Sequence, residues 1–309
     1  MAKSSGANAI GLGIGRGLLW QEARDGWLFA MPFVLGFLIW WAFPMGYSIF
    51  LIFQDWNLLT PATFVGLTNV QKLFQDPKVA ISLYNTAYLT FLGVPLQLIL
   101  ALILALALNV KLRGVAAYRT VFYLPSITPV VASAVVWLQI LHPEFGILNN
   151  FLERFGVRRV NWLFEPQAAK PALILMGMWG IGGAMVIFLA GLQGIPEQLY
   201  EAAMLDGANW WGRFTGVTLP LLSPFVFFQT IMGIISGFQA NFTTTYIMTG
   251  GGPQDATLVT VLYIYRNGFQ YFKMGYAATL AWLLFLIILF FTLVQFRLAG
   301  GWVYYEART

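Results

Sequence analysis

Six long apolar segments constrain the fold of this chain more than any other feature. A helix needs about 20 predominantly apolar residues to cross the hydrocarbon core of a bilayer. None of the six segments contains Asp, Glu, Lys or Arg. They cover residues 27–53, 86–109, 120–141, 171–192, 222–247 and 275–296. This pattern predicts an all-α, polytopic membrane protein with six transmembrane helices.

The composition excludes a water-soluble globular domain. Of the 309 residues, 59% are hydrophobic and 9% are charged, whereas soluble domains carry about 25% charged residues. The chain has no cysteine and a single histidine, His142, so we expect no metal centre built from thiolates or imidazoles. The net charge of +5 comes without the clustered basic face that nucleic acid requires. The expected surroundings are a lipid membrane.

The flanking segments suggest a simple domain organisation. Residues 1–26 are glycine-rich and polar and form an expected N-terminal tail, and residues 297–309 form a C-terminal tail. The transmembrane domain then covers residues 27–296. The first apolar segment is too long for the core of a cleavable signal peptide, so we expect it to remain as a spanning helix.

The charge distribution gives only a slight preference for one orientation. With six spans, both termini share a side with the connections 110–119 and 193–221. This side carries nine Lys and Arg residues, and the other side carries eight. Basic residues close to span ends favour the cytoplasm. The cluster of Lys111, Arg113 and Arg119 therefore favours cytoplasmic termini.

The polar connection 193–221 contains a short helix. Gly194-Ile195-Pro196-Glu197 is a plausible helix start, because proline and an acidic residue suit the first turn. Asp206-Gly207 can end the helix, since glycine accepts the left-handed conformation. Spacings of three and four place one apolar stripe on it, formed by Tyr200, Ala203, Met204, Gly207, Ala208 and Trp211.

Two interpretations of this helix remain open on physical grounds. An amphipathic helix can lie on the membrane surface, but such helices favour Lys and Arg. Here the charges are acidic, at Glu197 and Glu201. Small residues at positions 202, 203, 207 and 208 would also allow the backbone of another protein to approach closely.

The same stretch resembles the EAA loop of ABC-importer permeases. The resemblance rests on Glu201-Ala202-Ala203, then Asp206-Gly207-Ala208, then Leu219-Pro220. Residues 171–296 are similar to the maltose-type sugar permeases in particular, including Thr249-Gly250-Gly251-Gly252-Pro253 after the fifth apolar segment.

The resemblance implies a cytoplasmic coupling helix between the fourth and fifth spans, docked in a cleft of an ATP-hydrolysing subunit. Glu201 would pair with a basic residue there. Ala202, Ala203 and Ala208 would make close contacts, and Gly207 would form the turn. It also implies a second, homologous permease subunit as a heterodimer partner, two ATP-binding subunits and an extracytoplasmic substrate-binding protein. The expected location is a bacterial or archaeal plasma membrane.

The residue content agrees with an external energy source. The chain has no Walker A pattern, so ATP and Mg²⁺ would be bound by the partner ATPase and this chain would not be an enzyme. Proton-coupled carriers usually place Asp, Glu or His at membrane depth, and the apolar segments have no carboxylate. Sodium coupling through carbonyls and hydroxyls stays open. A membrane enzyme would need convergent catalytic groups, which the apolar segments lack.

Neutral polar residues within the spans indicate a candidate substrate path. Phe238, Asn241 and Thr245 share one helical face of the fifth span, with Gln239 beside it. In the maltose-type family, positions equivalent to Trp179, Gly183, Phe238 and Asn241 contact sugar, although Gly183 has no side chain to contribute. The alternative is that these residues serve as packing contacts between helices.

Aromatic rings and amides suit a sugar or oligosaccharide, because rings stack on apolar sugar faces while amides bond hydroxyls. Importers of glycerol phosphate or a polyol in the same superfamily are the alternative, and no basic residue lies in the spans to bind a phosphate. Four residues of the outer loops could dock a binding protein: Asn149, Asn150, Asn161 and Trp162.

Overall fold

The computed structural model describes residues 16–110 and 112–304, which form helices and one short pair of strands. The predicted helical class is confirmed. The chain divides into two compact units, Met1–Leu51 and Ile52–Thr309. Each unit is described separately.

Unit 1 is one helical stretch in three parts: α1 (Arg16–Phe37), the π-helical turn η1 (Leu38–Ala42) and α2 (Phe43–Leu51). The π turn lies before Pro44, which has no N–H to donate to the carbonyl of Trp40, so the turn widens there. Residues Trp20–Leu51 are long and apolar enough to span a membrane. The helix begins at Arg16, so part of the predicted tail 1–26 is helical, and residues 1–15 of that tail lie outside the described residues.

Three helical stretches of unit 2 have the length and composition of membrane spans. They are α4 (Pro77–Leu108), Trp210–Gln239 and α15 (Met274–Ala299). Trp210–Gln239 comprises α11 (Trp210–Arg213), the π turn η2 (Phe214–Thr218) and α12 (Leu219–Gln239). Helix α4 begins well before the apolar segment 86–109, because Asp76 caps it by accepting the N–H of Lys78 (2.9 Å) and Pro77 suits the first position.

Two of the predicted spans are interrupted. Helices α5 (Val115–Ile127) and α6 (Val130–Ile140) meet at 99°, and helices α8 (Pro166–Trp179) and α9 (Gly182–Gln193) meet at 48°. The described residues therefore contain four candidate spans, or six if each bent pair is one span. The fifth apolar segment is also broken, since α12 ends at Gln239 and α13 covers Asn241–Met248.

The bends have local causes in the sequence. Thr128 precedes Pro129, and the residue before a proline is driven from helical to extended backbone; Thr128 has φ −72° and ψ 132°. At the second bend, a Cβ atom on Gly182 would lie 2.3 Å from the carbonyl oxygen of Phe122. Glycine at position 182 therefore permits α9 to touch the backbone of α5.

Helix α4 forms the centre of unit 2 and packs against α8, α9 and α12. Small residues allow these close approaches, as is common between membrane helices. Ala101 and Ala105 on α4 are fully buried. On α12, a Cβ on Gly233 would lie 2.6 Å from Val94 Cγ1, and one on Gly237 would lie 2.7 Å from Thr90 Cγ2.

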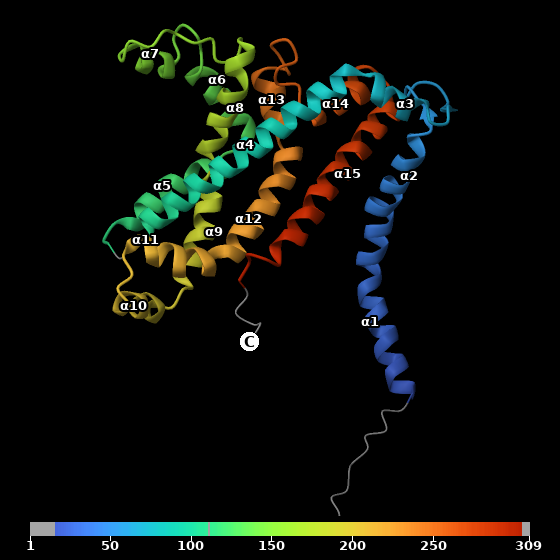
Figure 1. Cartoon of the computed structure of the whole chain (residues 1–309). Helices are drawn as coiled ribbons and strands as arrows, with labels where there is room; N and C mark the ends of the chain where they lie inside the picture. The colour runs from blue at the N-terminus through green and yellow to red at the C-terminus, as the bar shows by residue number, and fades with distance from the viewer. Residues whose placement is uncertain (1–15, 111, 305–309) are drawn as a thin grey trace, which may run out of the picture. The chain divides into compact units, whose positions relative to one another are not determined.

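Short elements occupy the two ends of unit 2 (Figure 1). Helix α10 (Glu197–Leu205), α11 and the C-terminal end of α15 lie at one end, which we call the α10 end. The other, the α7 end, carries six elements: β1 (Gln54–Asp55), β2 (Thr63–Phe64), α3 (Thr68–Gln75), α7 (Ile147–Glu153), α14 (Thr260–Tyr265) and the π turn η3 (Arg266–Gln270).

Candidate functional site

A cavity of about 230 Å³ lies where the helices of unit 2 are interrupted. All three breaks contribute to its lining: Thr128 between α5 and α6, Gly180 between α8 and α9, and Asn241 at the start of α13. Non-helical backbone within membrane proteins is tolerated where it lines a cavity, and broken helices build the substrate sites of many transporters. We call this space the break cavity.

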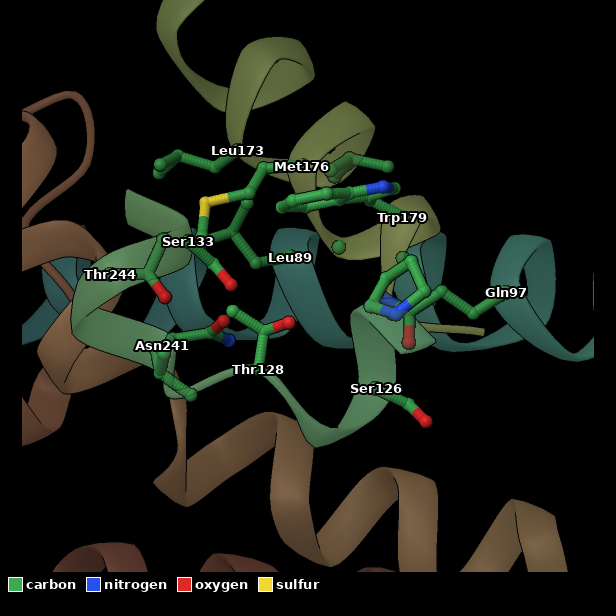
Figure 2. A pocket seen from close by; sticks show the side chains of 16 residues that line it. Leu89, Gln97, Ser126, Thr128, Ser133, Leu173, Met176, Trp179, Asn241 and Thr244 are labelled. Atoms are coloured by element: carbon green, nitrogen blue, oxygen red, sulfur yellow. The ribbon is translucent and has the colours of Figure 1, made fainter. Parts of the chain in front are cut away.

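The lining of the break cavity is neutral and amphipathic. Trp179 is 37% exposed and meets Trp137 edge-on, with ring centroids 6.0 Å apart. Figure 2 shows Trp179 on one side of the cavity, with Thr128 and Asn241 on the other. Within the described residues no Asp, Glu, Lys or Arg lines the cavity. An aromatic face opposite hydroxyl and amide groups can hold a hydroxylated, uncharged solute.

The structure brings only two of the six predicted path residues, Trp179 and Asn241, into this lining. Phe238 is 2% exposed and packs between Phe91 and Phe291, with centroid separations of 5.9 Å and 5.8 Å. Thr245 is fully buried and donates to the carbonyl of Asn241 at 2.6 Å. Phe238 and Thr245 are thus packed between helices in this structure.

The other two predicted residues also lie outside the lining. Gln239 is exposed. Gly183 faces open space, since a Cβ there would meet nothing within 4 Å.

Sequence reasoning missed Gln97, Thr128 and Ser133, which line the break cavity from α4, from the α5–α6 break and from α6. Gln97 lies close to Gly177: a Cβ atom on residue 177 would be 2.5 Å from the Nε2 atom of Gln97. The sequence offered a sign of two of them. Gln97 is an amide close to Pro95 within an apolar run, and Thr128 belongs to the polar stretch Ser126-Ile127-Thr128-Pro129.

Helix α10 covers Glu197–Leu205, with Glu197 in its first turn. Gly207 has φ +80°, the left-handed conformation. Its N–H bonds to Met204 O at 3.0 Å, and the N–H of Ala208 bonds to Ala203 O at 2.9 Å. These two bonds form a Schellman motif, the C-terminal cap that glycine permits.

Helix α10 protrudes from the rest of unit 2. None of its residues is buried, and Leu205 is 90% exposed. The hydroxyl of Tyr200 on α10 lies 3.0 Å from Thr218 Oγ1, just before α12. Glu201 lines a cavity of about 900 Å³ between α10 and the end of α4. A movement of α10 would therefore be passed to the base of α12 through Tyr200.

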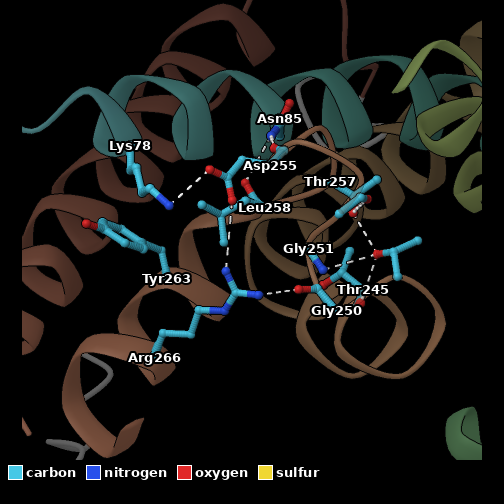
Figure 3. A network of polar contacts seen from close by, with 12 residues as sticks. Lys78, Asn85, Thr245, Gly250, Gly251, Asp255, Thr257, Leu258, Tyr263 and Arg266 are labelled. Carbon is cyan, nitrogen blue, oxygen red and sulfur yellow. Dashed lines mark hydrogen bonds and ion pairs between the residues drawn. The ribbon is translucent and has the colours of Figure 1, made fainter. Parts of the chain in front are cut away.

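A polar network fastens the loop between α13 and α14 at the α7 end (Figure 3). Asp255 pairs with Lys78 Nζ at 3.0 Å and lies 4.0 Å from Arg266 Nη1. Asn85 donates to the carbonyls of Asp255 (2.8 Å) and Leu258 (3.1 Å). The segment that follows the fifth predicted span is thus held against α4.

Asp76 forms a second polar centre at this end. It accepts hydrogen bonds from the hydroxyls of Tyr263 and Tyr276. Burial raises the pKa of the Asp76 carboxyl, but these bonds and that from Lys78 N–H outweigh it, so the pKa lies below its ordinary value of 3.8. Burial and the bond to Asp76 raise the pKa of Tyr263 to about 12.

The substitution Tyr263→Phe is expected to destabilise the α7 end by about 2 kcal/mol, since it removes a hydrogen bond to a charged acceptor. A carboxyl with a depressed pKa in the folded state contributes stability above its unfolded pKa and loses it as pH falls through the folded value. The deficit should therefore be complete at neutral pH and shrink below pH 3.8. Thermal unfolding at several pH values measures this, with the exposed Tyr271→Phe as control. An equal deficit at all pH values would contradict the account.

The predicted docking residues have structural partners. Asn149 is 1% exposed, donates to the carbonyls of Pro143 (3.0 Å) and Val160 (2.9 Å), and accepts from Trp162 Nε1 at 2.8 Å. Asn150 accepts from Arg159 at 3.3 Å. Asn149 and Trp162 therefore hold the loop around α7 together. Within the described residues no cluster of His, Asp or Glu could hold a metal ion.

Comparison with known proteins places the chain in a family. Residues 97–301 match the family model of the binding-protein-dependent transport system inner membrane component. The chain is 42% identical to the probable ABC transporter permease protein YesP of Bacillus subtilis, over 93% of this chain and 94% of the relative. It is 33% identical to the trehalose/maltose transport system permease protein MalF of Thermococcus litoralis, over 91% and 95%.

A solved structure has the same fold. The bacterial alginate ABC transporter in complex with alginate pentasaccharide-bound periplasmic protein contains a chain with a TM-score of 0.79 and 26% identity, covering 91% of this chain and 96% of that one. The chain therefore belongs to the family of binding-protein-dependent transport system inner membrane components, among its maltose-type sugar permeases, and is a multi-pass membrane protein.

Proposed function

We propose that the chain is a permease subunit of an ATP-driven, binding-protein-dependent importer and forms half of the path for a sugar or oligosaccharide. The main support for this proposal is the break cavity, where three interrupted helices meet around a neutral, amphipathic lining. Interrupted helices expose backbone groups to a solute without placing charges in the membrane.

The lining favours a neutral saccharide over glycerol phosphate or a polyol. A phosphate would favour a basic group in the path, and the described lining has none. A polyol lacks the ring face that Trp179 could stack against. The relative named for trehalose/maltose supports a neutral saccharide.

Helix α10 is, in this proposal, the coupling helix, and both termini lie in the cytoplasm with it. Glu201, Ala202, Ala203, Asp206, Gly207 and Ala208 would contact a cleft of one of two ATPase subunits, which bind ATP and Mg²⁺. The exposure of α10, its glycine cap and its tether to Thr218 support this role. Pro220 lies in the first turn of α12, where the transmitted movement would enter the membrane. The chain itself supplies transport, not ATP hydrolysis.

The proposal includes two further partners, a second permease subunit and a substrate-binding protein. A second permease subunit would form the other half of the path. A substrate-binding protein would dock at the α7 end. The existence of such a partner is supported by the solved alginate transporter, which is in complex with a periplasmic protein. The proposed location is the plasma membrane of a bacterium or archaeon.

The substitutions Trp179→Ala and Asn241→Ala are expected to lower uptake by roughly 2- to 10-fold each, the effect of losing one contact to the solute. Gln239→Ala serves as a matched control, because Gln239 is a neighbouring amide that does not line the break cavity. The measurement is saccharide uptake by proteoliposomes that contain the assembled transporter, with complex assembly checked for each variant. Equal effects of Asn241→Ala and Gln239→Ala would contradict the assignment of the cavity.

A further inference from the structure

Lys170 is a cation near the start of α8, and its amino group lies over two aromatic rings of α4. The Nζ atom is 4.7 Å from the ring centroid of Tyr84 and 5.1 Å from that of Tyr88. The same atom donates to Asn85 Oδ1 at 3.0 Å. Among the residues that the structure describes, no carboxylate pairs with Lys170. Ring faces and one amide oxygen therefore hold this charge, and they join α8 to α4.

Asn85 extends the connection to the loop between α13 and α14. Asn85 is 2% exposed, and its side-chain nitrogen donates to the carbonyls of Asp255 and Leu258 (Figure 3). A side-chain amide has one oxygen that accepts and one nitrogen with two N–H donors. The ammonium group can bond only to the oxygen, so Lys170 fixes the amide orientation that directs both N–H donors to the loop. We call Lys170, Tyr84, Asn85 and Tyr88 the lysine clasp.

The lysine clasp lies one helical turn from the break cavity. Residues four apart are neighbours on one face of a helix. Ile174 follows Lys170 by this spacing on α8, Leu89 follows Asn85 by it on α4, and both line the break cavity. The loop that Asn85 holds comes after α13, and Asn241 of α13 lines the cavity as well. The clasp thus joins three of the elements that form the cavity walls.

We propose that Lys170 is a positioning residue of the break cavity, a role that rests on the proposed function of this cavity in transport. The clasp fixes the separation between α8, which carries Trp179, and α4, which carries Gln97. A saccharide held between a ring face and polar groups on other walls needs a constant separation, because hydrogen bonds weaken steeply as their geometry departs from the optimum. Lys170 does not line the cavity, so it acts on the solute only through α8 and α4.

The test measures how often α8 separates from its neighbours, by labelling a buried cysteine in the assembled transporter in nanodiscs. The chain has no cysteine of its own, so one introduced thiol reports on one place in it. Ala172 on α8 is fully buried. A small maleimide reaches the thiol of Ala172→Cys only when the segment opens, so the labelling rate follows the population of the open state. Mass spectrometry of the permease chain measures this rate.

The substitution Lys170→Met removes the charge at similar side-chain length. It is expected to raise the labelling rate of Ala172→Cys about tenfold, because a hydrogen bond to a charged group is among the stronger single contacts. Lys170→Arg keeps the charge and should restore the wild-type rate. A second thiol, at the fully buried Ala101 in the contact between α4 and α9, should be labelled at the same rate in all variants. This thiol separates local opening from general destabilisation.

Two further comparisons test the source of the effect. Tyr84 is 61% exposed, so its substitution leaves the core intact. Tyr84→Leu removes the ring face and should raise the labelling rate about threefold, whereas Tyr84→Phe keeps the face and should not. Lys78→Met is the matched control, because Lys78 pairs with Asp255 at the same end of α4 without contact to α8. It should leave the rate unchanged.

Uptake of saccharide by proteoliposomes is the second readout, and we expect Lys170→Met to lower it and Lys170→Arg to restore it. Equal labelling of Ala172→Cys with and without Lys170→Met, or a failure of Lys170→Arg to restore the rate, would overturn the clasp whatever the uptake. Raised labelling with wild-type uptake, in a transporter that Trp179→Ala impairs, would overturn the positioning role. If neither Lys170→Met nor Trp179→Ala lowers uptake, the proposed function of the cavity fails, whereas raised labelling still supports the clasp.

Discussion

The substitution Glu201→Lys is expected to abolish ATP-driven uptake and to prevent stable assembly with the ATPase subunit. Glu201 lies on α10, which has no buried residue, so the reversed charge does not disturb the packing of unit 2. In the docked state it would place a cation against the basic residue that is proposed to pair with Glu201. Like charges at an interface cost several kcal/mol. Co-purification of the ATPase with the permease, followed by uptake in proteoliposomes, measures both effects.

The matched control is Glu144→Lys, which reverses an exposed acidic residue at the α7 end. This variant should still co-purify with the ATPase. A milder substitution, Glu201→Gln, removes the charge without reversing it and should fall between wild type and Glu201→Lys. If Glu201→Lys assembles and transports as wild type does, α10 does not dock through Glu201.

The substitution Gly182→Ala is expected to destabilise the fold where α9 contacts α5. Its Cβ would lie 2.3 Å from Phe122 O and 2.7 Å from Tyr123 Cα, and both are backbone atoms that cannot rotate away. Helix α9 would have to move from α5 at the bend that borders the break cavity. Overpacking of this kind costs about 1–3 kcal/mol. We therefore expect a lower thermal unfolding temperature and reduced uptake.

Gly183→Ala provides a control at the adjacent residue of the same helix. A Cβ there would meet nothing within 4 Å, so the unfolding temperature should stay at the wild-type value. Comparison of the two variants separates a general effect of alanine on α9 from the effect of disturbing the contact with α5. Equal unfolding temperatures for Gly182→Ala and Gly183→Ala would show that the two helices do not touch at this point.

Local signals in the sequence were sufficient to predict α10. Its start at Glu197 follows from Pro196, and its end follows from Gly207, which occupies the left-handed position. Both caps depend only on residues within one turn, so no tertiary information was needed. The role of the helix could not be predicted from these signals, because a docking helix and a membrane-surface helix share the same local pattern. The family resemblance, not the periodicity, separated them.

Local periodicity could not predict the lining of the break cavity. Phe238 and Asn241 share a helical face in a continuous helix, but the helix breaks at Ala240. Phe238 then faces Phe91 and Phe291, while Asn241 faces the cavity. The bend at Pro129 was visible as a proline, yet its 99° angle depends on how α6 packs. Which neighbour a face meets is decided by tertiary packing.

Disulfide cross-linking tests the central claim, that this permease is coupled to an ATPase through α10, most directly. The chain contains no cysteine, so single cysteines can be placed at will. Leu205→Cys on α10 and Ile147→Cys on α7 occupy positions that are 90% and 72% exposed at opposite ends of unit 2. We predict that Leu205→Cys cross-links to cysteines placed along the cleft of the ATPase subunit and that Ile147→Cys does not. Cross-linking of the ATPase to Ile147→Cys, with none to Leu205→Cys, would contradict both the orientation and the coupling role of α10.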